Sequence, residues 1–189
     1  MKTKFMLFLG IFISLGCSIC SAQGFQPPAS GKAMVYFVRA TGYGFAVKFQ
    51  YFHNDKFIGE FAGMNYLRYE CDAGKQLFWA VSENKEFLVA DLNEGGTYII
   101  KVNVIMGAMK ARVGFTPVSY TDTEQFQDCR DLIVKNPPKI TPEEDIEKTN
   151  LKLGKKISEN LKSYETTLKN EKNFRQLTAD MAIPPEGLK

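Results

Sequence analysis

The longest β pattern in the chain is TYIIKVNVI, residues 97–105. Tyr98, Ile100, Val102 and Val104 share one face of this segment, because successive side chains of a strand point to opposite sides. The alternation predicts a long strand with an apolar face. The turn residues Asn-Glu-Gly-Gly at 93–96 come just before it and predict a tight connection into the strand.

Runs of β-branched and aromatic residues extend on both sides of this strand, separated by turn residues at intervals of about ten. Residues 32–39 are apolar almost throughout, as in a strand covered on both faces. Residues 72–75, Asp-Ala-Gly-Lys, predict a hairpin turn. No strand-helix-strand spacing is present, so a parallel sheet is not expected. The pattern predicts a mainly β fold, an antiparallel β-sandwich of about seven or eight strands over residues 32–118.

The composition changes after Val118. Residues 119–138 predict a short helix and a linker, with the prolines at 137 and 138 ending the helix. Residues 139–182 predict an amphipathic helical region in which Thr141 caps the first turn. Its apolar stripe recurs at helical spacing and consists of Leu153, Ile157, Leu161, Tyr164 and Leu168. Residues 183–189 predict a loose tail.

The N-terminus has the order of a secretory signal peptide over residues 1–22. Lys2 and Lys4 precede a short apolar run, and Ala22 supplies the small residue before the cut. The chain is therefore expected to be exported, either periplasmic or secreted, with an extended leader at residues 23–31. The alternative is lipidation of Cys17, which makes the protein a membrane-anchored lipoprotein. No segment has the length and apolarity that an integral membrane span needs.

Cleavage removes the charges of Lys2 and Lys4, so the formal net charge falls from +3 to +1. A nearly neutral chain gives no electrostatic argument for nucleic-acid binding, which needs a clustered basic face. Cleavage also leaves two cysteines, Cys71 and Cys129. An oxidising compartment permits a disulfide between them, and two unpaired thiols are the alternative.

The segments around the turns are similar to those of a known domain family. They are GKAMVYFVR at 31–39, NDKFIG at 54–59, Tyr66, DAGK at 72–75 and GGTY at 95–98. Over about residues 31–118 the chain resembles the bacterial envelope domain of unknown function 2846 family, a small β domain like the PEGA type. The resemblance implies a β-sandwich in secreted proteins or lipoproteins, with no known reaction. It does not extend to the helical region.

No constellation of residues predicts catalysis, a metal site or a cofactor. His53, the only histidine, lies beside the Asn54-Asp55 turn, where we expect a solvated edge residue. One histidine and two separated cysteines do not supply the ligands of a zinc site. Paired carboxylates suit glycosidase chemistry. The nearest such acids are Glu83 with Glu86, Glu70 with Asp72, and Glu143 to Asp145, and each has a structural explanation in a turn, a solvated face or a helix start.

Five aromatic residues alternate out of phase with the expected core, namely Phe45, Tyr51, Phe52, Tyr66 and Phe78. One interpretation is an exposed face that binds an envelope protein or a glycan. The other is that the apolar stripe of the C-terminal helix covers these residues.

The sequence therefore predicts a non-enzymatic secreted or envelope-associated module with a binding or structural role and no cofactor. One alternative is an envelope hydrolase that acts through paired carboxylates. Another is a scaffold that self-associates through the helical stripe of residues 153–168.

Overall fold

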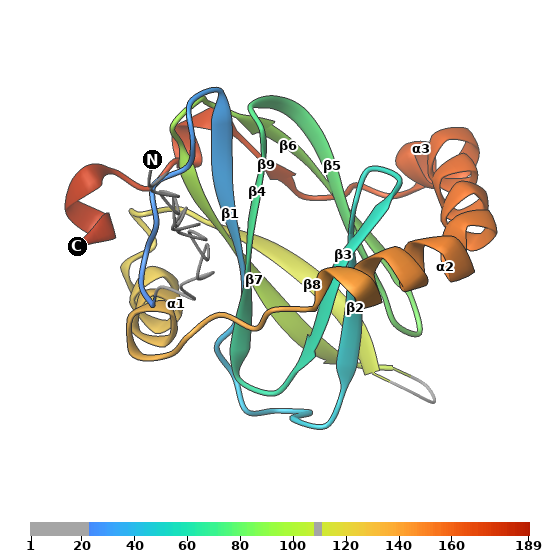
Figure 1. Ribbon diagram of the computed structural model, residues 1–189, viewed down its shortest axis with the longest axis horizontal. Helices are drawn as coiled ribbons and strands as arrows, with labels where there is room; N and C mark the ends of the chain where they lie inside the picture. Colours follow the sequence, from blue (N-terminus) through green and yellow to red (C-terminus); the bar gives the residue numbers. More distant parts are fainter. Residues whose placement is uncertain (1–22, 108–110) are drawn as a thin grey trace, which may run out of the picture.

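The computed structural model describes residues 23–107 and 111–189, which form two packed β-sheets with helices on their outer sides (Figure 1). The first sheet has the strand order β4-β1-β7-β8, and the second has the order β3-β2-β5-β6-β9. The fold is mainly β and sandwich-like, as the sequence predicts. The strands are β1 Lys32–Arg39, β2 Lys48–His53, β3 Lys56–Ala62, β4 Asn65–Asp72, β5 Gly74–Val81, β6 Lys85–Leu92, β7 Thr97–Met106, β8 Ala111–Val118 and β9 Gln176–Leu177.

Both sheets are mixed, which corrects the expectation of a purely antiparallel sandwich. β1 pairs in parallel with β7, so that Val35 lies opposite Tyr98. β6 pairs in parallel with the short strand β9. The chain visits the second sheet twice between β1 and β7, and the two central strands of the first sheet therefore meet without being neighbours in sequence.

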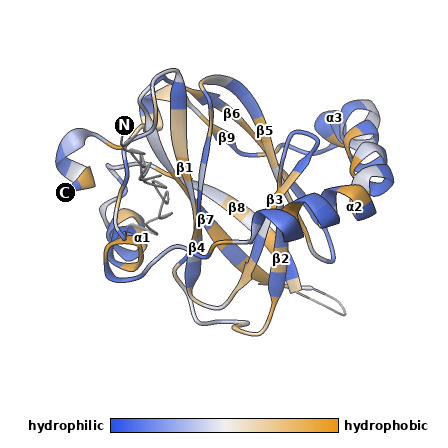
Figure 2. Cartoon of the chain, in the orientation of Figure 1, coloured by the Kyte–Doolittle hydropathy of each residue, from blue (hydrophilic) through white to orange (hydrophobic). Residues whose placement is uncertain are grey.

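The central position of β1 explains why residues 32–39 are apolar on both faces. Val35 and Phe37 point into the core between the sheets, whereas Tyr36 and Val38 point outward beneath helix α1 (Thr123–Lys135). A third apolar cluster lies on the outer face of the second sheet beneath helix α2 (Glu143–Ser163). Figure 2 shows the resulting pattern, with apolar residues along the strands and hydrophilic residues on the outer side of α2.

The turn at residues 72–74 does not close a hairpin. β4 ends at Asp72 in the first sheet, and β5 begins at Gly74 in the second. Gly74 adopts a φ of 92°, so the chain does turn at the predicted residues. The expected hairpin is wrong because a turn of this composition reverses the chain without deciding which strands pair afterwards. Asn54, with a φ of 49°, lies in the turn that closes the β2–β3 hairpin.

The apolar stripe of the C-terminal helical region packs on the second sheet. This region consists of α2, a π-helical turn at Tyr164–Leu168 and α3 (Lys169–Glu171). Tyr164 stacks on Phe87 with 4.5 Å between ring centroids. The stripe residues Leu153, Ile157, Leu161, Tyr164 and Leu168 all join the cluster around Trp79 and Phe87. The stripe is thus covered by the sheet.

The start of α2 differs from the capping box expected at Thr141. Helix α2 begins at Glu143, and no side chain caps it. The Thr141 hydroxyl instead accepts a hydrogen bond of 3.3 Å from the backbone N–H of Glu60 on β3. The Asn150 side chain binds both backbone groups of Phe57, at 2.8 and 3.2 Å. These contacts cover the edge of β3, which protects it from pairing with another chain.

The C-terminal residues pack against the first sheet, which corrects the expectation of a loose tail. Ile183 is buried, and its N–H donates to the carbonyl oxygen of Thr97 at 2.8 Å. Short 3-10 turns lie on either side of Ile183, at Ala179–Met181 before it and at Pro185–Leu188 after it. A Cβ on the buried Gly187 would lie 2.8 Å from the side chain of Ile183. The C-terminal segment packs through single apolar residues that do not recur at a helical or strand period, so the sequence pattern does not predict this packing.

Residues 1–22 lie outside the described residues, and with them the expected signal peptide and Cys17. Within residues 23–107 and 111–189, no helix is long and apolar enough to cross a membrane.

Candidate functional site

Strand directions bring four connections to one end of the sandwich, which we call the loop end (Figure 1). β1 ends at Arg39, opposite the start of β4 at Asn65. β7 runs parallel to β1, so its last residue, Met106, lies at the same end. In the second sheet, β2 begins there at Lys48, opposite Ala62 at the end of β3. The loop end carries residues 40–47, 63–64 and 82–84 and the last residues of β7.

Large apolar side chains are exposed at the loop end. Phe45 is 74% exposed and Met106 is 78% exposed. Tyr43, Met64 and Ile105 are each at least half exposed. The Tyr43 hydroxyl donates to the sulfur of Met106 at 3.2 Å, which joins the first connection to the end of β7. We call these five residues the apolar tip patch.

The segments that carry the apolar tip patch lie close together and are uncharged. The sulfur of Met64 lies 3.7 Å from the position that a Cβ on Gly42 would take. A Cβ on Gly63 would lie 3.7 Å from the carbonyl oxygen of Phe45. The three contributing segments read ATGYGFAV at 40–47, GM at 63–64 and IM at 105–106, and none of them contains a charged residue.

Charged residues lie directly behind the patch on both outer faces of the sandwich. Lys48 forms an ion pair of 2.8 Å with Glu60 on the neighbouring strand. Arg112 is exposed near the start of β8. Phe49 and Val113, the residues next to Lys48 and Arg112, point into the core between the sheets. Because side chains alternate along a strand, Lys48 and Arg112 flank the patch from opposite sides.

A buried arginine holds the connection that carries Tyr43 and Phe45. Arg39 is fully buried at the end of β1. Its guanidinium donates to the carbonyl oxygens of Val47 at 2.7 Å, of Tyr43 at 2.8 Å and of Gly44. Burial lowers the pKa of Arg39, yet an arginine keeps its charge at neutral pH. Three backbone oxygens therefore take the place of a carboxylate partner, and residues 43–47 close around the guanidinium.

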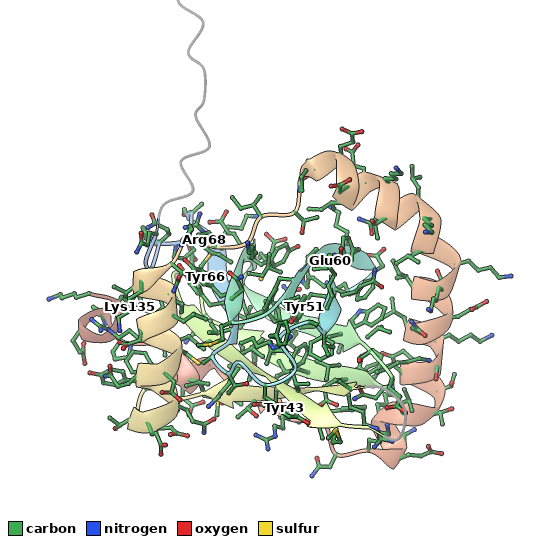
Figure 3. All side chains as sticks on the ribbon, turned by 90° about the horizontal axis from the view of Figure 1, so that it is seen from below. Tyr43, Tyr51, Glu60, Tyr66, Arg68 and Lys135 are labelled. Carbon is green, nitrogen blue, oxygen red and sulfur yellow. The ribbon has the colours of Figure 1, made fainter. Side chains whose placement is uncertain are left out.

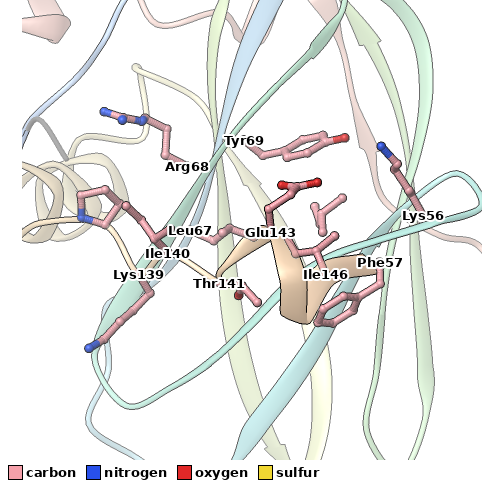
Figure 4. A pocket seen from close by; sticks show the side chains of 12 residues that line it. Lys56, Phe57, Leu67, Arg68, Tyr69, Lys139, Ile140, Thr141, Glu143 and Ile146 are labelled. Atoms are coloured by element: carbon pink, nitrogen blue, oxygen red, sulfur yellow. The ribbon is translucent and has the colours of Figure 1, made fainter. Parts of the chain in front are cut away.

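A second feature is a cavity of about 240 Å³ at the side of the sandwich, next to the edge strands β3 and β4 (Figure 4). The linker before α2 lines it, and the N–H of Lys139 donates to the carbonyl oxygen of Tyr66 at 2.8 Å. Figure 4 shows Tyr69 and Glu143 near each other at the cavity, whereas the Lys139 side chain leads away. The apolar part of the lining consists of Phe57, Ile58, Leu67, Pro138, Ile140 and Ile146.

Tyr69, on the wall of this cavity, is bonded to the only histidine. Its hydroxyl lies 3.0 Å from Nδ1 of His53, and Nε2 of His53 lies 2.8 Å from Oε1 of Gln76. An amide oxygen only accepts, so this network assigns the proton to Nε2 and lets Nδ1 accept from Tyr69. Burial lowers the pKa of His53 and raises the pKa of Tyr69 to about 12. His53 is therefore half-buried in a network rather than a solvated edge residue.

The cavity offers few free polar groups. The Tyr69 hydroxyl is bonded to His53, and the Thr141 hydroxyl accepts from the backbone of β3. Lys56 and Glu143 are exposed at its rim. Specific ligand sites combine an apolar lining with convergent polar groups. Because its hydroxyls are already bonded, this cavity carries a weaker functional argument than the apolar tip patch.

Several acids considered for hydrolysis have structural partners instead. The Glu70 carboxylate accepts from the N–H of Ala29 in the leader at 2.8 Å. Asp72 pairs with Lys32 at 2.7 Å. Burial raises the pKa of Glu86. No group of three or more metal-ligating side chains occurs in the part of the chain that the structure describes.

The structure keeps Cys71 and Cys129 apart as free thiols. Cys71 on β4 faces the core between the sheets, and Cys129 on α1 packs on the outer face of the first sheet. The sheet itself separates the two sulfurs, so of the two alternatives the structure shows the unpaired thiols and not the disulfide. Burial raises the pKa of both thiols to about 12, which keeps them protonated and unreactive at neutral pH.

Four of the five aromatic residues considered as a partner-binding face are buried. Tyr51 and Phe78 point into the core between the sheets, and Phe52 lies beneath α2. Tyr66 lies beneath α1, on the side of the sandwich opposite α2 (Figure 3). Phe45 alone of the five is exposed. The interpretation as an exposed face is wrong, because both faces of each sheet are covered and alternation no longer separates core from surface.

Four members of the apolar tip patch were not predicted from the sequence, namely Tyr43, Met64, Ile105 and Met106. They belong to two connections and the end of β7, which meet only in the folded chain. One signal was present, since residues 40–47 form an uncharged connection with two aromatic residues. Connections are ordinarily rich in polar turn residues.

The fold and the patch define a mainly β protein of two mixed sheets with C-terminal helices and an apolar loop end. No protein-family model, curated protein or solved structure matches the chain. The resemblance to the domain of unknown function 2846 family therefore stays a prediction.

Proposed function

We propose that this protein is a non-enzymatic module, exported to the cell envelope or secreted, that binds a partner through the apolar tip patch. The observation that carries the proposal is the joint exposure of five large apolar side chains from two connections and the end of β7, with no charge among them. Large contiguous apolar patches are uncommon on soluble monomeric proteins, and they mark interaction sites.

The buried Arg39 supports this proposal. It bonds the carbonyl oxygens of Tyr43, Gly44 and Val47, so the connection that presents Phe45 is held in one conformation. A preorganised surface loses less conformational entropy when it binds. The exposed Phe45 side chain contributes nothing to the core, so a purely structural role of this connection does not explain its exposure.

Methionine oxidation tests the proposal. Met64 and Met106 are exposed, whereas Met34 is 5% exposed and serves as an internal control. Peroxide converts accessible methionines to the sulfoxide. We expect Met64 and Met106 to oxidise several-fold more slowly in the native envelope or secreted fraction than in the purified protein, with Met34 slow in both. Equal rates for Met64 and Met106 in the two preparations contradict the proposal.

A further inference from the structure

We infer that the partner of the apolar tip patch is a lipid bilayer surface, into which the tips insert at the boundary between headgroups and acyl chains. The inference rests on the proposed function and names the chemistry of the partner. Three properties of the loop end support it: the size of the patch, the internal bonding of its backbone and the position of its charges.

The patch is small and consists of separate tips. A specific protein interface uses about 20–30 residues and about 800 Å² on each partner. The apolar tip patch has five side chains, which come from two connections and the end of β7. A protein partner has to match these tips in shape, whereas acyl chains rearrange around each tip. Amphipathic surfaces bind bilayers in proportion to the apolar area that they insert.

In the connection between β1 and β2, residues 40–47, backbone carbonyl groups are hydrogen-bonded within the protein. Polar backbone groups that approach hydrocarbon need internal partners, because water is not there to bond them. The carbonyl oxygens of Tyr43, Gly44 and Val47 accept from the buried guanidinium of Arg39. The Gly44 carbonyl oxygen also accepts from the N–H of Val47 at 2.8 Å. Arg39 thus lowers the cost of placing residues 43–47 at an apolar boundary.

The charges of the loop end lie at the depth of the headgroups when the tips insert. Lys48 and Glu60 neutralise each other as an ion pair, and the exposed side chains of Arg112 and Glu83 carry opposite charges. The apolar tips therefore supply most of the binding free energy. We expect binding to neutral phosphatidylcholine vesicles and a gain of less than about threefold when a fifth of the lipid is anionic.

Vesicle sedimentation tests the inference. The full chain is expressed with Cys17→Ser, so that an acyl anchor at residue 17 cannot contribute. Burial of one large apolar side chain corresponds to about tenfold in a partition coefficient. We expect Phe45→Ser and Met106→Ser each to lower the vesicle partition coefficient about tenfold. Leu151→Ser is the matched control, because Leu151 is 87% exposed on α2, away from the loop end, and its loss is expected to change nothing.

A second measurement reports insertion directly. Trp79 is fully buried, so the Phe45→Trp variant adds a single exposed indole. We expect its emission to shift to the blue on vesicles and to be quenched by lipids brominated on their acyl chains. A protein whose parent form does not sediment with vesicles, or whose Phe45→Ser variant sediments equally well, overturns the inference. If Met64 and Met106 are still protected from oxidation in the native fraction, the proposed function stands and the partner is a protein or a glycan.

Discussion

The two ends of the sandwich differ in most of their connections. At the loop end, the segments 40–47, 63–64 and 105–106 are uncharged and expose large apolar side chains, whereas the turn at 82–84 reads SEN and is polar. At the other end, which we call the polar end, the turns read ND at 54–55, DAGK at 72–75 and NEGG at 93–96. These polar turns are also tied to the leader, where Glu94 accepts from the N–H of Gly31 at 2.7 Å.

The comparison of the two ends shows that folding requires the chain to reverse at each turn but does not require exposed apolar side chains there. Polar turn residues reverse the chain at the polar end without exposing apolar surface. The loop end performs the same reversals but leaves Phe45 and Met106 in solvent, which gives no stability to the folded chain. The composition of the loop end therefore indicates a function outside the fold, and four changes test this contrast.

The largest effect is expected for Arg39→Ala. The substitution removes three hydrogen bonds to the backbone and leaves space for a large side chain in a fully buried position. We expect the free energy of unfolding to fall by about 3 kcal/mol in chemical denaturation. Lys48→Ala is the matched control at the same end, since the Lys48 side chain is mostly exposed, and it should leave the denaturation midpoint nearly unchanged. A midpoint for Arg39→Ala equal to that of the parent protein refutes the proposed role of the guanidinium.

A pair of glycines gives the next effect. Gly44 at the loop end has a φ of 64°, and an added Cβ would lie 2.9 Å from the Val104 side chain. Gly74 at the polar end has a φ of 92° with nothing within 4 Å of the added Cβ. Both alanine variants are destabilised by the left-handed conformation, by about 1–2 kcal/mol. Gly44→Ala should lose about 1 kcal/mol more because of the contact with Val104. Equal losses argue against close packing of the first connection.

A smaller effect, confined to a pH window, is expected at the polar end. Burial lowers the pKa of His53 below its usual 6.5, so the unfolded chain binds a proton more readily than the folded chain. The free energy of unfolding is therefore expected to decrease as the pH falls through about 6.5 towards the lowered value. The stability of His53→Gln, measured by denaturation between pH 7 and pH 5, should depend less on pH. A pH dependence that is identical in the two proteins assigns the effect to other groups.

The smallest effect is expected for Phe45→Ser. Phe45 is largely exposed, so its replacement removes no core contact, and the free energy of unfolding should change by less than about 0.5 kcal/mol. Thermal or chemical denaturation checks this directly. A marked destabilisation gives Phe45 a structural role and weakens the argument that the loop end serves binding.

Much of the fold could be predicted from local patterns. The strand expected at residues 32–39 has those bounds in β1, and the short helix expected within residues 119–138 is α1 at Thr123–Lys135. The 153–168 stripe does share one helical face and packs on the sheet. These features follow from propensity, turn chemistry and side-chain period, which act over a few residues.

The errors in assigning the aromatic residues and the cysteines share one physical cause. Phe78 and Trp79 are successive residues of β5, and both are fully buried, one between the sheets and the other beneath α2. When both faces of a sheet are covered, alternation no longer indicates which side is the core. Cys71 and Cys129 were paired in one reading for the same reason, since the sequence did not show that the first sheet lies between them.

By itself, the sequence determined where the strands and helices form, which turns reverse the chain and which helical face is apolar, because these properties depend on near neighbours. The tertiary structure alone decided that β1 meets β7 in parallel and that Ile183 packs under Thr97. It also brought Tyr43, Met64 and Met106 together at the loop end. Such contacts join residues far apart in the chain, and they form only when the sheets pack. The direction of each strand then decides at which end of the sandwich its connection lies.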